Sequence, residues 1–106
     1  MKRYHSWCLV VLLFAAAPAS ALQMITGKVK EIEVSYMPGQ VRFTLTEGNA
    51  TCPAGKQLIW TNSNAENNKA VYAALAAALS SGKAVRFYFD DGDESCIGKF
   101  FYMVDV

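Results

Sequence analysis

The sequence contains little histidine, cysteine or proline: one, three and three residues among 106. The single histidine, His5, lies in the first segment of the chain, so the rest of the protein lacks the commonest general base and zinc ligand. Glu31 and Glu33 alternate along a predicted strand with lysine neighbours, which is typical of a solvated strand edge. We therefore expect no enzyme activity, no cofactor and no metal site.

Long hydrophobic runs are also scarce. The longest, residues 7–17, follows Lys2 and Arg3 and precedes the small residues of Ala19-Ser20-Ala21. A basic start, a short apolar run and a small-x-small motif are typical of a secretory signal peptide. The run is shorter than the roughly 20 residues of a membrane-spanning helix. We predict a cleaved signal peptide over residues 1–21, a single domain over residues 22–106, and a secreted or periplasmic protein with no membrane span after cleavage.

Neither positive nor negative charge predominates in the sequence. Removing Lys2 and Arg3 from the ten basic residues leaves eight, against nine acidic residues. Nucleic-acid binding proteins usually carry a basic patch, and proteins on membrane surfaces a polybasic or amphipathic stretch. We expect neither kind of partner.

Two cysteines, Cys52 and Cys96, remain after residue 21. An even number of cysteines in an exported chain predicts a disulfide bond, and a domain of this size benefits from one. Two free thiols are the alternative.

The strand pattern begins at residue 25, and its alternation changes phase near Lys30-Glu31, which predicts a bulged and bent strand to residue 36. Pro38-Gly39 predicts a turn in which the glycine has positive φ. Further strands are predicted over residues 41–46, 56–61, 84–90 and 99–106.

A helix is predicted between the third and fourth strands. Ser63 and Glu66 form a capping box, and Ser80-Ser81-Gly82 ends the helix. Val71, Leu75 and Leu79, with Tyr72 beside them, predict the stripe that packs on the sheet. This order of elements predicts a five-stranded, oligonucleotide/oligosaccharide-binding (OB)-like Greek-key barrel with one helix and one disulfide bond.

Candidate ligand-binding residues are aromatic or planar polar side chains predicted to point outward. They are Tyr36, Arg42, Thr44, Arg86 and Tyr88. The alternative is that they are ordinary exterior residues, because tyrosine and threonine are favoured in strands. Trp60 is predicted to lie in the core.

Alanine fills six of the nine positions from Ala70 to Ala78. Ala73, Ala77 and Ser80 lie off the predicted stripe and could let another subunit approach closely. High helix propensity on an exposed face explains the same pattern.

The motif Lys56-Gln57-x-Ile59-Trp60, followed by a helix that contains a tyrosine and then by Ser80, Gly82, Val85 and Arg86, resembles the B subunit of subtilase cytotoxin and related pertussis-like toxins. The resemblance covers roughly residues 56–89. It implies a secreted, disulfide-bonded barrel that forms a pentameric ring with its helices around a pore. It also implies that the ring binds cell-surface glycans and carries a separate catalytic A subunit. The sequence departs from that family in two respects: its cysteine positions do not follow the family's pattern, and the family's sugar-contacting residues find no match near the first hairpin.

Two functions follow as expectations. One is a non-catalytic exported binding module, a glycan-binding subunit like those toxin B subunits. The other is a monomeric periplasmic or envelope accessory protein with a structural or inhibitory role.

Overall fold

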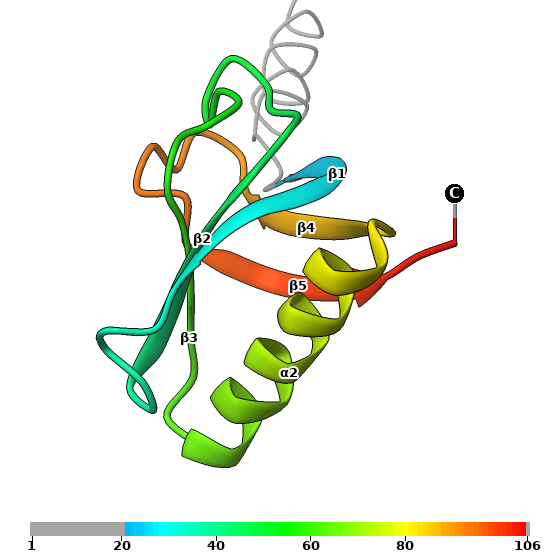
Figure 1. The fold of residues 1–106 in the computed structure, drawn as a ribbon. Helices are drawn as coiled ribbons and strands as arrows, with labels where there is room; N and C mark the ends of the chain where they lie inside the picture. Colours follow the sequence, from blue (N-terminus) through cyan, green and yellow to red (C-terminus); the bar gives the residue numbers. More distant parts are fainter. Residues whose placement is uncertain (1–20, 106) are drawn as a thin grey trace, which may run out of the picture.

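The computed structural model describes residues 21–105, which form five strands and one helix (Figure 1). The order of three strands, a helix and two strands is the predicted one. The predicted signal peptide lies outside the described residues except for Ala21. The elements are β1 Leu22–Glu33, β2 Gln40–Leu45, β3 Leu58–Thr61, α2 Ala65–Ser81, β4 Ala84–Asp90 and β5 Gly98–Met103.

All strands belong to one antiparallel sheet in the order β3-β2-β1-β4-β5. The sheet curls until its two edge strands approach at a single parallel bridge between Ile59 and Ile97. There the N–H of Ile59 donates to the carbonyl of Cys96 at 3.0 Å. The architecture is therefore an open, curled sheet with one helix, and the strand ladder does not close into a barrel.

The first strand is long enough to serve both halves of the sheet. It pairs with β4 through Leu22 to Lys28 and with β2 from Val29 onward, and the register shifts between Val29 and Glu31. This shift confirms the bulge predicted from the change of phase at Lys30-Glu31. The extra residue lets one strand turn from one half of the sheet into the other. The strand ends at Glu33, three residues earlier than predicted.

The core lies between the inner face of the sheet and α2. It is built from the apolar residues that alternate along β2, β3 and β4, and it includes Trp60 as predicted. Phe43 packs edge-on against Phe87, with 5.4 Å between ring centroids, and against Phe101 at 6.1 Å. Cys52 and Cys96 are both buried and joined by the predicted disulfide bond.

The buried face of α2 differs in part from the face predicted from the sequence. Val71 and Leu75 are buried as predicted, but Tyr72 and Leu79 are 37% and 45% exposed. A step of four residues turns about 40° beyond a full turn, so a strict four-residue repeat drifts off any one face. Steps of three and four residues stay on the face, and the buried residues are Asn68, Val71, Leu75 and Ala78.

The ends of α2 agree with the sequence in part. The helix ends as predicted at Gly82, which has φ +75° and donates its N–H to the carbonyl of Ala78. It begins one residue later than the predicted capping box. Asn64 is the N-cap, and its Oδ1 accepts from the N–H of Glu66 at 2.9 Å. Asparagine caps as well as serine does, so the sequence could not separate Asn64 from Ser63.

The turn between β1 and β2 also differs in detail from the prediction. Gly39 does not have positive φ, and the Met37–Pro38 peptide bond is cis. The turn is held by the carbonyl of Tyr36, which accepts from the N–H groups of Gly39 at 2.9 Å and Gln40 at 3.2 Å. These two bonds fix the backbone on both sides of the turn.

Candidate functional site

Tyr36 and Arg42 form a stacked pair beside the turn between β1 and β2. The guanidinium carbon of Arg42 lies 4.9 Å from the centroid of the Tyr36 ring. Tyr36 as a whole remains 52% exposed, while Arg42 is half-buried. A cation above an aromatic face is attracted to the ring, so the contact favours keeping the two groups together.

Two polar side chains accept hydrogen bonds from the arginine, and a third holds one of these two. The arginine Nε donates to Oε1 of Gln40 at 2.6 Å, and one terminal nitrogen donates to Oε1 of Gln57 at 3.2 Å. Gln57 in turn donates from Nε2 to Oε1 of Glu33 at 2.8 Å. We call Glu33, Tyr36, Gln40, Arg42 and Gln57 the hairpin cluster.

The fold brings the hairpin cluster together by strand register. Arg42 alternates with the buried residues Val41 and Phe43, so its side chain points away from the core. Glu33 is its direct partner on β1. The result is an aromatic ring, one guanidinium, two amides and one carboxylate on the outer side of the hairpin, a set suited to binding and orienting a polar ligand.

Arg86 and Tyr88 belong to a second surface, on the outer side of β1, β4 and β5. Register places Tyr88 between Met24 and Phe100, and Arg86 between Thr26 and Tyr102. We call Met24, Arg86, Tyr88, Phe100 and Tyr102 the outer aromatic face. The Tyr88 ring lies edge-on to Phe100 and Tyr102, with centroids 6.3 and 5.6 Å away. Met24, Phe100 and Tyr102 are each about half exposed, and Arg86 donates from Nε to Oγ1 of Thr26 at 3.0 Å.

The structure thus divides the five candidate ligand residues. Tyr36 contacts Arg42 in the hairpin cluster, and Arg86 shares the outer aromatic face with Tyr88. The fifth residue, Thr44, was expected to point into solvent, but it is only 8% exposed. It pairs with Glu31 on β1, directly after the register shift that marks the bulge. We therefore leave Thr44 out of the candidate site.

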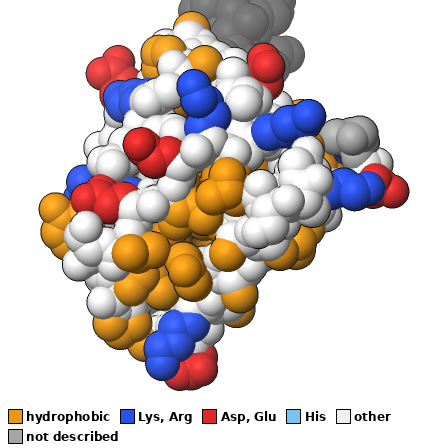
Figure 2. All heavy atoms as spheres, in the orientation of Figure 1, with side chains coloured by type: hydrophobic (Ala, Val, Ile, Leu, Met, Phe, Trp, Pro, Cys, Tyr) orange, Lys and Arg blue, Asp and Glu red, His pale blue; other side chains and the backbone are white. Residues whose placement is uncertain are grey.

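The alanine-rich side of α2 faces away from the sheet. Ala73, Ala77 and Ser80 are all exposed. Hydrophobic side chains also gather over the middle of the face shown in Figure 2, around β3 and β5, with charged side chains at its border. The exposed hydrophobic residues of α2 and β5 include Tyr72, Leu79 and Met103.

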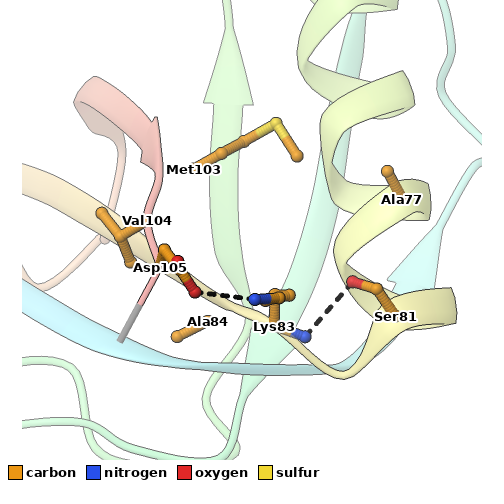
Figure 3. A pocket seen from close by; sticks show the side chains of 7 residues that line it. All are labelled: Ala77, Ser81, Lys83, Ala84, Met103, Val104 and Asp105. Atoms are coloured by element: carbon orange, nitrogen blue, oxygen red, sulfur yellow. Dashed lines mark hydrogen bonds and ion pairs between the residues drawn. The ribbon is translucent and has the colours of Figure 1, made fainter.

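A pocket of about 370 Å³ opens where the end of α2 meets the end of β5 (Figure 3). Ala77, Ala84 and Met103 supply apolar walls. The ammonium of Lys83 lies 2.6 Å from Oδ1 of Asp105 at the same site. Both partners of this ion pair are more than half exposed, so the pair adds little stability.

The disulfide bond ties the loop after β2 to the acidic loop before β5. Close by, Lys56 donates from Nζ to the carbonyl of Glu94 at 2.6 Å. The carboxylate of Asp93 accepts from the N–H groups of Ser95 and Ile97, at 2.9 and 3.2 Å. It therefore serves to fold its own loop. Among residues 21–105, no group of three or more acidic, cysteine or histidine side chains is arranged to hold a metal ion.

Sequence reasoning missed Asn68, a buried polar residue beneath the hairpin. It is 1% exposed, and its Nδ2 lies within hydrogen-bond distance of three backbone carbonyls. The signal was present, because Asn68 lies three residues before Val71 on the face of the helix that packs on the sheet. A polar side chain at a core-facing position of a helix requires a hydrogen-bond partner.

Comparisons of the chain with protein-family models, curated proteins and solved structures found no match. No helix in the described part of the chain is long and apolar enough to cross a membrane.

Proposed function

We propose that this protein is an exported, non-catalytic binding module that recognises acidic glycans through its hairpin cluster. In this proposal the domain is a partly open version of the OB-type barrel of the pertussis-like toxin B subunits. The support is the strand order and the approach of β3 to β5 in parallel orientation at Ile59 and Ile97. These two strands are the edges of the sheet, and a sheet closes into a barrel only where its edges meet.

The stacked pair of Tyr36 and Arg42 carries the proposal. The ring offers an apolar face on which a sugar can stack, and a guanidinium is suited to a carboxylate because it presents planar, paired donors. The bonds from Arg42 to Gln40 and Gln57 orient that guanidinium before a ligand arrives. A group held in its binding orientation loses less freedom when the ligand binds.

A sialoglycan array followed by titration of the best glycan tests this function. We expect the wild-type protein to bind a defined set of sialylated glycans. Arg42→Ala should weaken binding by roughly tenfold or more, since it removes a charge-assisted contact. Tyr36→Ala should weaken it to a similar degree.

Arg86→Ala is the matched control, because Arg86 is also a half-buried arginine on a strand but belongs to the outer aromatic face. It should leave the affinity within about twofold of wild type, a change small against a tenfold step. Equal losses in Arg42→Ala and Arg86→Ala, or no binding to any glycan, would count against the proposed site.

A second candidate function is an envelope accessory protein that binds another protein. The observation that favours it is the outer aromatic face, because aromatic residues, methionine and arginine are enriched in protein interfaces. A monomeric protein with a blank glycan array would support this function. In that case Tyr102→Ala, rather than Arg42→Ala, should reduce capture of the partner.

The assembly proposed with the glycan function is a homo-oligomeric ring, a pentamer that carries a separate A subunit. Its support is the exposed small-residue side of α2 with Ala73, Ala77 and Ser80, over which a neighbouring subunit can approach closely. A closed symmetric ring is a common way for small domains to bury more surface.

A further inference from the structure

Asn68 links three segments of the chain from below the hairpin. Its Nδ2 lies 2.8 Å from the carbonyl oxygen of Pro38, 3.0 Å from that of Gly39 and 2.9 Å from that of Asn62. Its Oδ1 is buried and has no partner within the described residues. An amide nitrogen carries two hydrogens, so three carbonyls share two donors. The side chain of Asn68 therefore acts only as a hydrogen-bond donor to the described residues around it.

Two of these acceptors lie in the turn that carries the hairpin cluster. The carbonyl of Gly39 also accepts from Oγ1 of Thr61 at 2.9 Å, so β3 and α2 hold the same peptide group. The N–H of Gly39 donates to the carbonyl of Tyr36. A chain of hydrogen bonds thus runs from the buried side of α2 to the backbone of the exposed tyrosine.

The arginine of the stacked pair depends on the same turn. Gln40, which follows Gly39, donates its N–H to the carbonyl of Tyr36 and accepts from Arg42 through its side chain. A shift of the Gly39 peptide would move both Tyr36 and the side chain that orients Arg42. The stack requires the ring and the guanidinium to keep their separation of 4.9 Å.

We propose that Asn68 is a positioning residue, which holds the turn over residues 36–40 in the conformation that stacks Arg42 on Tyr36. Its effect on glycan affinity rests on the proposed function. Asn68 contacts no ligand in this proposal. It acts through the backbone of Pro38 and Gly39, and it couples the first turns of α2 to the hairpin cluster.

The test compares Asn68→Ala with Asn64→Ala in the full mature protein. Both variants remove an asparagine from the start of α2. Asn64 caps the helix by accepting from Glu66, whereas Asn68 donates to the hairpin turn. Asn64→Ala therefore controls for general loosening of the helix. Should Asn68→Ala fail to fold, Asn68→Ser replaces it, because it leaves a smaller cavity. A hydroxyl supplies one donor in place of two, so the turn amides should still exchange faster than in Asn64→Ala.

The first readout is amide hydrogen exchange of Gly39 and Gln40, whose N–H groups both donate to Tyr36. In Asn68→Ala we expect these amides to exchange about tenfold faster or more, while the amide of Leu75 in the helix changes by less than about twofold, because the opening is local. Asn64→Ala should leave the two turn amides at the wild-type rate. Turn amides that exchange no faster in Asn68→Ala than in Asn64→Ala would overturn the proposal.

The second readout is glycan affinity. If the competent turn conformation falls to about a tenth of the population, the apparent affinity falls by about tenfold. An unchanged affinity together with a loosened turn would show that Asn68 does not position the site. A wild-type protein that binds no glycan would remove the proposed function, while the exchange of the turn amides would still decide whether Asn68 holds the turn.

Discussion

Gly98 lies at the start of β5 against two aromatic side chains of the core. A Cβ at this position would lie 2.6 Å from Cε1 of Phe87 and 2.7 Å from Cε3 of Trp60. Phe87 is fully buried and Trp60 nearly so, and neither ring has room to withdraw. The backbone of Gly98 is not left-handed. This glycine is therefore needed for space and not for its conformational freedom.

Gly98→Ala should lower the free energy of unfolding by about 2–3 kcal/mol, since overpacking of a tight core has a cost of this size. The control is Gly55→Ala, which meets no atom within 4 Å but has φ +84°. It should cost about 1 kcal/mol, from backbone strain alone. Urea denaturation of both variants measures the difference. A Gly98→Ala protein as stable as wild type would show that the two rings can move.

At the scale of single residues, the sequence predicted a residue's role correctly where its chemistry allows few alternatives. Cys52 and Cys96 are the only two cysteines in residues 22–106, which left one possible pairing. Trp60 was predicted to lie in the core because a lone tryptophan on a short strand usually packs, and it is buried.

The sequence was less informative where the answer depends on a distant segment. The residues next to Gly98 in the sequence do not indicate its contact with Phe87, and the alternation along β2 does not indicate that Thr44 is buried. Asn68 could have been suspected from its helical spacing, but its three carbonyl partners come from two separate loops.

The helix shows what periodicity predicts at the scale of one element. Leu75 and Leu79 differ by one turn and have the same side chain. Leu75 is fully buried, whereas Leu79 is 45% exposed. Substitutions of these two leucines therefore compare a covered and an uncovered position of the same helix without a difference in residue type.

Leu75→Ala should cost about 2–5 kcal/mol of unfolding free energy, the usual range for deleting a fully buried leucine. Leu79→Ala should cost less than about 1 kcal/mol, because half of its side chain already contacts water and alanine has the higher helix propensity. Chemical denaturation of the two variants under the same conditions measures both losses of unfolding free energy. Comparable losses would mean that Leu79 is covered in solution, for example by another subunit.

The bulge in β1 is the feature of a single element that the sequence predicted most specifically. A change of phase from odd to even positions can be satisfied only by an extra residue, and the register shift lies at that place. The ends of the strands were less predictable. The pairing of β1 with β2 stops at Glu33, where the chain enters the turn. The apolar alternation nevertheless continues to Tyr36, so it did not mark the end of the strand.

For the molecule as a whole, the order of elements could be predicted but the closure of the barrel could not. Element order follows from local patterns, whereas closure depends on how far β3 and β5 run beside each other. They share one bridge next to the half-cystine Cys96. The disulfide bond thus lies beside the only contact between the two sheet edges that has the form of a strand bridge in residues 21–105.

Removing the disulfide bond by the double substitution Cys52→Ser and Cys96→Ser should lower the unfolding free energy by about 3–4 kcal/mol. The two cysteines are 44 residues apart, and a loop of this length strongly restricts the unfolded chain. Reduced wild-type protein is the control and should match the double variant. A loss below about 1 kcal/mol in both would show that the bond does not restrict the unfolded chain as the loop-closure argument requires.

The oligomeric state decides between the two explanations of the alanine-rich helix. If Ala73, Ala77 and Ser80 contact a neighbouring subunit, light scattering on a size-exclusion column should give a discrete mass near that of a pentamer. Ala77→Arg should then convert the ring to monomers, because a large charged side chain cannot enter a close helix contact. Ala50→Arg, on an exposed loop, should leave the ring intact. A wild-type monomer would contradict the proposed assembly, and helix propensity alone would then explain the alanines.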